Sequence, residues 1–238
     1  MSLEHSHDPD EIAARLKAAR ETGGDLKDTV FGAIDGAVTT FAIVAGVAGA
    51  GLPTGVIVAL GVANVLADGF SMAAGNYSGT KAELDYARTV RAYEHRQIDR
   101  EPEGEREELR QILAAKGLDG PLLEEATDAI TKHRESWVDM MMIDEYGLSP
   151  VDPNPMRAAV VTFFAFLAAG LVPLLPFLIV LPYSFNWSVA LTGVVFFAIG
   201  ALKSRFSLSP WWRSGLETLL IGGAAAGIAY FVGSLFSV

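Results

Sequence analysis

Long apolar stretches, separated by short polar breaks, dominate this chain of 238 residues. Crossing roughly 30 Å of hydrocarbon takes about 20 apolar residues in a helix, which satisfies its own backbone hydrogen bonds in lipid. Lysine and arginine are absent between Lys27 and Lys81, between Arg157 and Lys203, and after Arg213. The pattern predicts five membrane-spanning helices, at residues Thr29–Ala50, Thr54–Thr80, Met156–Leu181, Trp187–Leu202 and Ser214–Phe236.

Prolines and charges refine this picture of an all-α integral membrane protein. Pro173 and Pro176 fall inside the third span and predict a kink there, because proline removes a backbone donor. The positive-inside rule places loops rich in lysine and arginine in the cytosol. All six basic residues near the span ends lie on one side, which puts the N-terminus in the cytosol and the C-terminus outside it: Lys27, Lys81, Arg157, Lys203, Arg205 and Arg213.

A polar insert separates the second span from the third. Residues 81–152 contain 18 acidic and 10 basic residues, a net charge of −8. Helix-forming residues continue from the second span without glycine or proline, so that span is expected to extend as one long helix. The insert is predicted to be a cytosolic three-helix domain, with helices at Ala82–Asp99, Glu105–Lys116 and Pro121–Tyr146.

The whole chain therefore divides into four parts: a polar cytosolic leader at 1–28, two spans at 29–80, the acidic insert at 81–152 and three spans at 153–238. The leader is polar and acidic and lacks the apolar core of a signal peptide.

Composition narrows the chemistry. Hydrophobic residues make up 51% of the chain, the mean hydropathy is +0.33, and cysteine is absent, which excludes thiolate metal sites and cysteine nucleophiles. A net charge of −10 argues against a nucleic-acid partner, since phosphate neutralisation needs a basic face. Cations are the expected partners.

Few polar side chains fall within the first two spans. A carboxylate at membrane depth is costly, so Asp35 and Asp68 are candidate functional residues. Asp68 shares a four-residue helical stripe with Asn64, Met72 and Asn76. A carboxylate beside a thioether suits a borderline divalent transition metal better than Mg²⁺ or Ca²⁺. The alternative is that these carboxylates are structural and bond to a neighbouring helix.

Glu217 and the acidic residues of the insert have simpler explanations. Glu217 lies in the fifth span one turn after Arg213, and a local ion pair would account for it. Acidic residues recur along the insert, where a solvated surface is the ordinary interpretation and a metal site the alternative. A ferritin-like di-iron enzyme is not supported, because Ala92 and Ile130 precede His95 and His133 where that motif needs glutamate.

Three sequence strings resemble the vacuolar iron transporter family: DGAVTTFAIVAG at 35–46, ADGFSMA at 67–73 and LVPLLPF at 171–177. The resemblance extends from about residue 28 to the C-terminus. It implies a homodimer of five-helix subunits that exchanges cytosolic Fe²⁺, and often Mn²⁺, for protons. It also implies a cytosolic metal-binding domain at the position of the insert.

The resemblance assigns roles residue by residue. It places Asp35 and Met72 on the translocation path, with Asp68 as a further candidate from the stripe described above. It implies metal ligands in the insert at Glu94, Glu105, Glu108 and Glu145, together with Met141 and Met142. Gln97 departs from the family, which commonly has glutamate there, and an amide is a weaker ligand.

The leading functional hypothesis is therefore a proton-coupled exporter of Fe²⁺ or Mn²⁺ from the cytosol, with no enzymatic activity and no prosthetic group. The sequence leaves the choice among Fe²⁺, Mn²⁺, Co²⁺ and Zn²⁺ open. The alternative is a membrane-anchored metal buffer or sensor, which would have no use for carboxylates at membrane depth. A bacterial inner membrane is the expected location, or a vacuolar membrane in a eukaryote.

Overall fold

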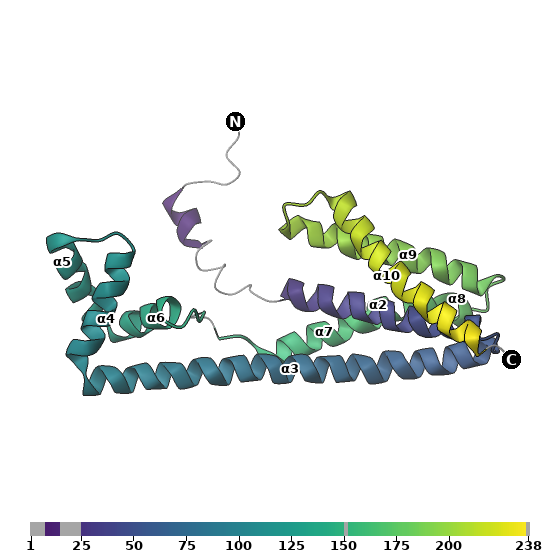
Figure 1. Ribbon diagram of the computed structural model, residues 1–238, viewed down its shortest axis with the longest axis horizontal. Coiled ribbons are helices and arrows are strands. Elements are labelled where there is room, and N and C mark those ends of the chain that lie inside the picture. The colour runs from purple at the N-terminus through teal and green to yellow at the C-terminus, as the bar shows by residue number, and fades with distance from the viewer. Residues whose placement is uncertain (1–7, 15–24, 150–151, 237–238) are drawn as a thin grey trace. The chain divides into compact units, whose positions relative to one another are not determined.

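The computed structural model describes residues 8–14, 25–149 and 152–236, which form helices and no strand. These residues belong to two compact units (Figure 1). We call residues 25–78 and 155–236 the membrane unit, and residues 79–149 and 152–154 the insert unit. Of the leader expected at 1–28, only residues 8–14 and 25–28 are described, and the last four already belong to the first long helix.

Five helices of the described residues are long and apolar enough to cross a membrane, as the sequence predicts. They are α2 (Asp25–Gly49), α3 (Thr54–Arg100), α9 (Ser184–Lys203), α10 (Trp211–Leu235) and a segment at Pro155–Leu178. That last segment is interrupted, because α7 (Pro155–Gly170) gives way to the 3-10 turn η1 (Val172–Leu174) and the short α8 (Leu175–Leu178). Pro173 and Pro176 fall in these short elements, so the departure from a straight helix lies where a kink was predicted, and it is a full interruption of the helix.

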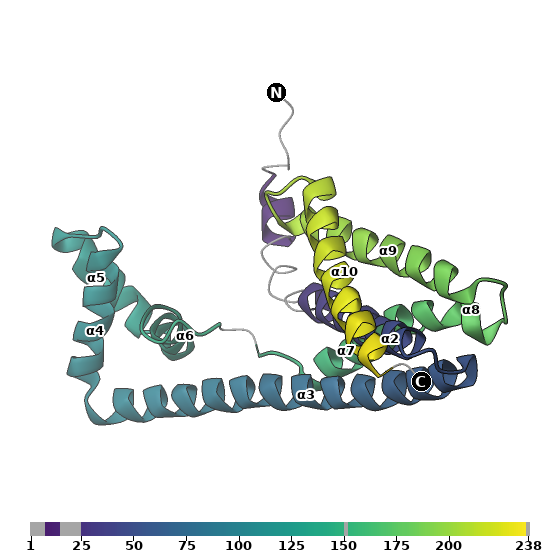
Figure 2. The ribbon, with the colours of Figure 1, turned by 45° about the vertical axis from the view of Figure 1, so that its right-hand side comes forward.

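Helix α2 is the centre of the membrane unit and packs against α7, α9 and α10 (Figure 2). Small residues let the backbones approach closely, as is usual between helices in lipid. A Cβ atom at Gly36 would collide with the carbonyl oxygen of Phe166 on α7, and one at Gly233 on α10 would collide with the carbonyl oxygen of Gly46. These contacts hold α2 in a fixed rotation, so its polar side chains have defined neighbours.

Helix α3 has 47 residues and is continuous from the apolar part at residues 54–80 to Arg100, as expected from the absence of glycine and proline at residues 82–99. The rest of the insert differs from the prediction. After α4 (Pro102–Ala115), the third helix expected at Pro121–Tyr146 is two helices, α5 (Gly120–Thr131) and α6 (Arg134–Asp144). The prediction of one continuous helix there is wrong.

Tertiary contacts explain the break between α5 and α6. Arg134 starts α6 and donates to the carboxylate of Asp99 at 2.6 Å and to the ring of His95, both on α3. Trp137 then enters the apolar core of the insert unit with an exposed fraction of only 6%. That core collects residues from all four helices, namely Val90, Ile98, Leu109, Leu113, Leu123, Trp137, Val138, Met141 and Met142.

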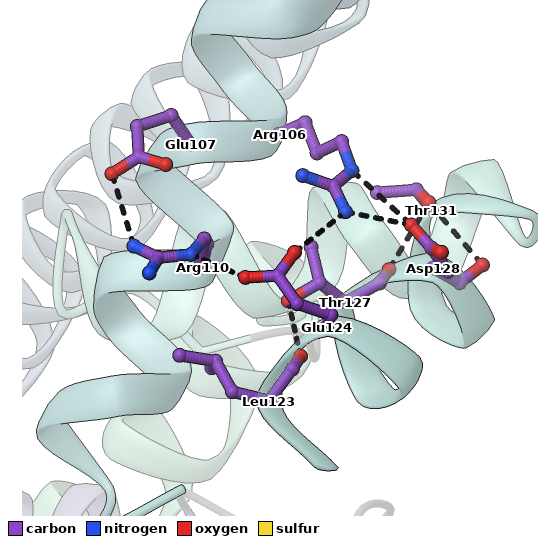
Figure 3. Close-up of polar contacts among 8 residues, drawn as sticks. All are labelled: Arg106, Glu107, Arg110, Leu123, Glu124, Thr127, Asp128 and Thr131. Carbon is purple, nitrogen blue, oxygen red and sulfur yellow. Dashed lines mark hydrogen bonds and ion pairs between the residues drawn. The ribbon is translucent and has the colours of Figure 1, made fainter. Parts of the chain in front are cut away.

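Ion pairs connect α4 to α5 on the surface of the insert unit (Figure 3). Arg106 bonds Glu124 at 3.0 Å and Asp128 at 2.8 Å, and Arg110 bonds Glu124 at 2.7 Å. Exposed pairs of this kind add little net stability, because water screens them and the side chains lose freedom. The apolar core therefore supplies most of the stability of the insert unit.

Candidate functional site

Two buried carboxylates face each other inside the insert unit. Glu94 on α3 has an exposed fraction of 1%, and Glu105 on α4 has one of 5%. The two carboxyl groups lie close enough for the charge of Glu94 to act on Glu105. Glu108 on α4 and Glu145 after α6 are exposed, and their charges act on the buried pair. We call Glu94, Glu105, Glu108 and Glu145 the acidic cluster.

Helix periodicity places the two buried glutamates where apolar residues are expected. On α3, Glu94 lies four residues after Val90 and four before Ile98, which are both core residues. On α4, Glu105 begins the same repeat with Leu109 and Leu113. This interruption of an apolar stripe by a carboxylate is a signal that the sequence contained. It distinguishes both residues from the solvated acidic surface around them.

The buried pair is incompletely satisfied. The hydroxyl of Tyr146 donates to Glu94 Oε1 at 3.0 Å, but Oε2 of Glu94 and Oε2 of Glu105 are buried without a hydrogen-bond partner among the described residues. Leaving a polar atom buried and unpaired costs about 1–3 kcal/mol, and more for a charge. A bound cation between these oxygens would remove that cost.

Burial and mutual repulsion alter the acid strength of the cluster. Burial, followed by repulsion from Glu108, Glu94 and Glu145, raises the pKa of Glu105 to about 7. Burial also raises the pKa of Glu94, although the hydrogen bond from Tyr146 opposes the change. Burial raises the pKa of Glu145 as well. Near neutral pH Glu105 therefore exchanges a proton that a divalent cation could displace.

An open hollow of about 280 Å³ adjoins the cluster and is lined by Glu108, Gln111, Ile112 and Glu145. Within the described parts of the chain, no three acidic or histidine side chains converge closely enough to surround an ion. Because Glu108 and Glu145 are exposed, their side chains are free to turn towards the buried pair. The acidic cluster is therefore an open site that a cation could reach from solvent, and not a preformed coordination sphere.

The other insert residues implied by the resemblance lie in different surroundings. Met141 and Met142 are buried in the apolar core, with exposed fractions of 0% and 2%. Gln97 is half-buried on α3, one turn beyond Glu94. Tyr146 and Gln111 contact or line the site but were not selected from the sequence. Gln111 lies three residues after Glu108, so helical spacing could have indicated it, whereas Tyr146 lies beyond the end of α6 and had no such signal.

In the membrane unit, Asp35 on α2 and Asp68 on α3 lie close enough for their charges to interact. Both are half-buried, as is Met72 one turn further along α3. The hydroxyl of Thr39 donates to the backbone carbonyl oxygen of Asp35 at 2.8 Å and not to its side-chain carboxylate. The structure thus brings Asp35 and Asp68 together across the hairpin between the first two spans.

A second polar contact crosses the same hairpin and was missed in the sequence. The side-chain amide of Asn76 on α3 donates to Asp28 Oδ1 at 2.9 Å and to Thr162 Oγ1 on α7 at 2.7 Å. Asp28 has an exposed fraction of 8%, and Thr162 is fully buried. We call Asp28, Asn76 and Thr162 the polar node. Asp28 lies seven residues before Asp35 and so on the same face of α2, but the predicted span began just after it.

The polar node fixes the register of the antiparallel α2–α3 pair. Seven residues after Asp28 is Asp35, and seven residues before Asn76 is Gly69, the neighbour of Asp68; twelve residues from each end place Thr40 level with Asn64. Thr40 Oγ1 and Asn64 Nδ2 are buried and have no hydrogen-bond partner within the described part of the chain. Polar side chains therefore lie at three successive levels along this helix pair. Burying so many polar groups within a membrane is costly, and such residues commonly mark an ion pathway.

Glu217 is not part of this stripe. It is exposed on α10, and its carboxylate lies 3.9 Å from the ammonium group of Lys203 rather than beside Arg213. Arg213 instead lies over the ring of Trp212, at 5.1 Å from its centroid. The expected ion pair of Glu217 with Arg213 is therefore wrong, because Lys203 is the nearer cation across the α9–α10 contact.

Comparison with known proteins covers both units. The model of the VIT family matches residues 26–234. Vacuolar iron transporter 1 of Arabidopsis thaliana is 33% identical over 215 residues, covering 88% of this chain and 85% of the plant protein. The vacuolar iron transporter of Centaurea cyanus is 34% identical and covers 91% and 90%. That of Toxoplasma gondii is 32% identical and covers 90% of this chain and 74% of its own.

Proposed function

Because the chain belongs to the VIT family, a family of metal transporters rather than enzymes, we propose that it carries Fe²⁺, and Mn²⁺ with it, out of the cytosol in exchange for protons. The related proteins are named vacuolar iron transporters, which supports iron as the transported substrate. Five apolar helices place the chain in a membrane as a multi-pass protein. The proposal adds a direction, a counter-ion and a set of residues.

The observation that carries the proposal is the buried pair Glu94 and Glu105, each with an unpaired oxygen. Such a pair is expensive as a purely structural feature, because two neighbouring carboxylates repel each other and one must keep a proton. A divalent cation neutralises both at once. Carboxylate oxygens with the nearby Gln97 amide suit Mn²⁺ and Fe²⁺, and Met141 or Met142 would need to leave the core to add a thioether.

Transport would proceed in two stages. The acidic cluster first binds the ion and replaces part of its hydration shell. The ion then passes along the polar stripe of the α2–α3 pair, where Asp35, Asp68 and Met72 offer carboxylates and a thioether. A proton that returns to Asp35 removes its charge and weakens its hold on the metal. We propose that two copies of the chain form the working transporter.

The proposed orientation places the insert unit in the cytosol and the C-terminus outside it. A reporter fused after Val238 should then give a non-cytosolic signal, and a reporter inserted within residues 101–120 a cytosolic one. The same signal at both positions would contradict the five-span topology. This orientation suits export across a bacterial inner membrane and filling of a vacuole equally, so localisation needs its own measurement.

Purified protein in liposomes tests the transport itself. We expect uptake of Fe²⁺ and Mn²⁺ that depends on a pH gradient, together with proton movement in the opposite direction. Saturable metal binding without any flux would identify a membrane-anchored buffer or sensor instead. Co²⁺ and Zn²⁺ belong in the same assay, because the ligand types alone do not rank these ions.

Calorimetry on the full-length protein tests the acidic cluster. Replacing Glu105, Glu108 and Glu145 by alanine should remove most high-affinity metal binding. The matched control replaces three exposed glutamates outside the cluster, Glu83, Glu103 and Glu125, and removes the same charge. If both variants lose the same metal affinity, the acidic residues attract cations only through their net charge and do not form a specific site.

A further inference from the structure

The segment that joins α9 to α10 combines unpaired positive charge with exposed apolar side chains. Residues 203–213 include Lys203, Arg205 and Arg213 and no acidic residue. Lys203 has Glu217 as a neighbour at 3.9 Å. Within the part of the chain that the structure describes, Arg205 and Arg213 form no ion pair and are both exposed. Two guanidinium groups are therefore available to an anion.

The apolar side chains of the segment lie on the surface beside these charges. Leu208 is fully exposed, and Trp211 and Trp212 have exposed fractions of 59% and 48%. Tryptophan at the end of a membrane span commonly sits at headgroup level, where its ring is apolar and its N–H group remains hydrated. The segment lies at such an end, between two of the five apolar helices.

Packing holds this surface in place. The ring of Trp211 meets that of Phe197 on α9 edge to face, with centroids 5.8 Å apart. Gly215 allows the approach, because a Cβ atom there would lie 2.7 Å from the ring of Phe197. Arg213 lies over Trp212, which orients its guanidinium while leaving its N–H groups available. Trp211 and Arg213 are thus held in the first turn of α10, where that helix packs against α9.

We propose that this segment binds the phosphate headgroup of an anionic phospholipid, with Arg205 and Arg213 on the phosphate and Leu208, Trp211 and Trp212 in the interfacial layer. A free phosphate would use the arginines but would leave the apolar side chains in water. A protein partner is less suited, because the surface lies where lipid headgroups are already concentrated. Charge and apolar surface together fit a ligand that has both a phosphodiester and acyl chains.

Tryptophan quenching by brominated lipid tests the proposal in full-length protein. Trp187→Phe removes the tryptophan at the far end of α9, and Trp137 lies buried in the insert core, so quenching in liposomes reports Trp211 and Trp212. We expect brominated phosphatidylglycerol to be preferred over brominated phosphatidylcholine. The double substitution Arg205→Gln with Arg213→Gln should lower that preference by roughly fivefold for each arginine removed.

Two further variants separate a site from general attraction. Arg205→Lys with Arg213→Lys keeps the charge and should retain the preference. Lys27→Gln with Lys81→Gln removes two charges at other span ends and should leave it unchanged. The proposal is overturned if the glutamine variant keeps the parental preference, or if the Lys27 and Lys81 variant loses as much. Abolition of the preference by excess inorganic phosphate would overturn the lipid assignment and identify a free-anion site.

Discussion

The hydroxyl of Tyr146 donates a hydrogen bond of 3.0 Å to Oε1 of Glu94, and it does so from beyond the end of α6 to the middle of a core-facing stripe on α3. The contact satisfies one oxygen of a carboxylate whose other oxygen has no partner in the residues that the structure describes. Glu94 is therefore held in place on one side and left open on the other. That is the arrangement expected of a ligand positioned by a second residue.

Removal of this hydroxyl should weaken metal binding without removing a ligand. Tyr146→Phe takes away the hydrogen bond that lowers the pKa of Glu94, so the carboxyl will hold its proton more strongly. We expect the affinity for Mn²⁺ to fall by about tenfold near pH 6.5, and by less at pH 8. Calorimetry at both pH values measures the change.

Tyr93→Phe is the matched control, because Tyr93 is exposed on the same helix. It should bind Mn²⁺ as the parent does. An affinity loss of equal size at pH 6.5 and pH 8 in Tyr146→Phe would mean that the hydroxyl acts by packing and not through the protonation of Glu94.

The stability of the metal-free insert should decrease as the pH rises. Burial and repulsion raise the pKa of Glu105 from 4.5 to about 7. A group whose pKa is higher in the folded state contributes stability that is fully present below pH 4.5 and is lost as the pH rises through about 7. Thermal unfolding, followed by Trp137 fluorescence with the other three tryptophans replaced by phenylalanine, should show a lower midpoint at pH 8 than at pH 5.

Two variations of this experiment identify the cause. Saturating Zn²⁺ should restore the midpoint at pH 8, because the ion binds the folded state. Glu105→Gln should flatten the dependence on pH, since the amide cannot ionise. A midpoint that rises with pH in the parent protein would contradict the assignment of the raised pKa to this cluster.

The sequence predicted the membrane unit well, because lipid imposes a strict length and polarity on each span. A kink at Pro173 and Pro176 was also predicted, because proline disturbs a helix through its own local chemistry. The break between α5 and α6 could not be seen, because neither glycine nor proline marks it. Contacts of Arg134 with α3 produce it, and contacts between segments distant in sequence leave no local trace.

The candidate site divides in the same way. Glu94 and Glu105 were selected by family resemblance, yet their burial could have been inferred from the apolar residues four positions away on each helix. The polar node was missed because Asp28 lay one residue outside the predicted span. Its contact with Asn76 depends on how α2 pairs with α3, which a single sequence does not specify.

The polar node should contribute substantially to the stability of the membrane unit. Asn76→Ala leaves the nearly buried carboxylate of Asp28 and the hydroxyl of Thr162 without their amide donor. We expect a loss of about 1–3 kcal/mol in the free energy of unfolding in detergent. Combined with Asp28→Ala, the loss should be smaller than the sum of the single losses, because both substitutions remove the same interaction.

Ser78→Ala is the comparison, since the exposed hydroxyl of Ser78 donates to the carbonyl oxygen of Ala74 in its own helix. It should change stability little. Strictly additive losses for Asn76→Ala and Asp28→Ala would show that the two side chains are not energetically coupled.

Met72 should influence which metal is carried more than how fast. Its thioether is a soft ligand that adds preference without charge, and it lies one turn from Asp68. Met72→Ala should therefore lower Fe²⁺ flux more than Mn²⁺ flux in the same liposomes. Met72→Leu keeps the volume and should show the same change in ratio. If both fluxes fall equally in the two variants, the side chain contributes shape and not ligation.

Asp35 provides the most direct test of the path through the membrane unit. Asp35→Asn keeps the size and the hydrogen-bonding capacity of the side chain but removes the charge, and it also relieves the repulsion from Asp68. A structural role would therefore tolerate the change or benefit from it. An ion path would not, because the site loses the carboxylate that binds the cation and accepts the returning proton. We expect Fe²⁺ flux to be abolished while calorimetry still detects metal binding at the acidic cluster. Flux at the parental rate under the same pH gradient would exclude Asp35 from the path and direct attention to Asp68.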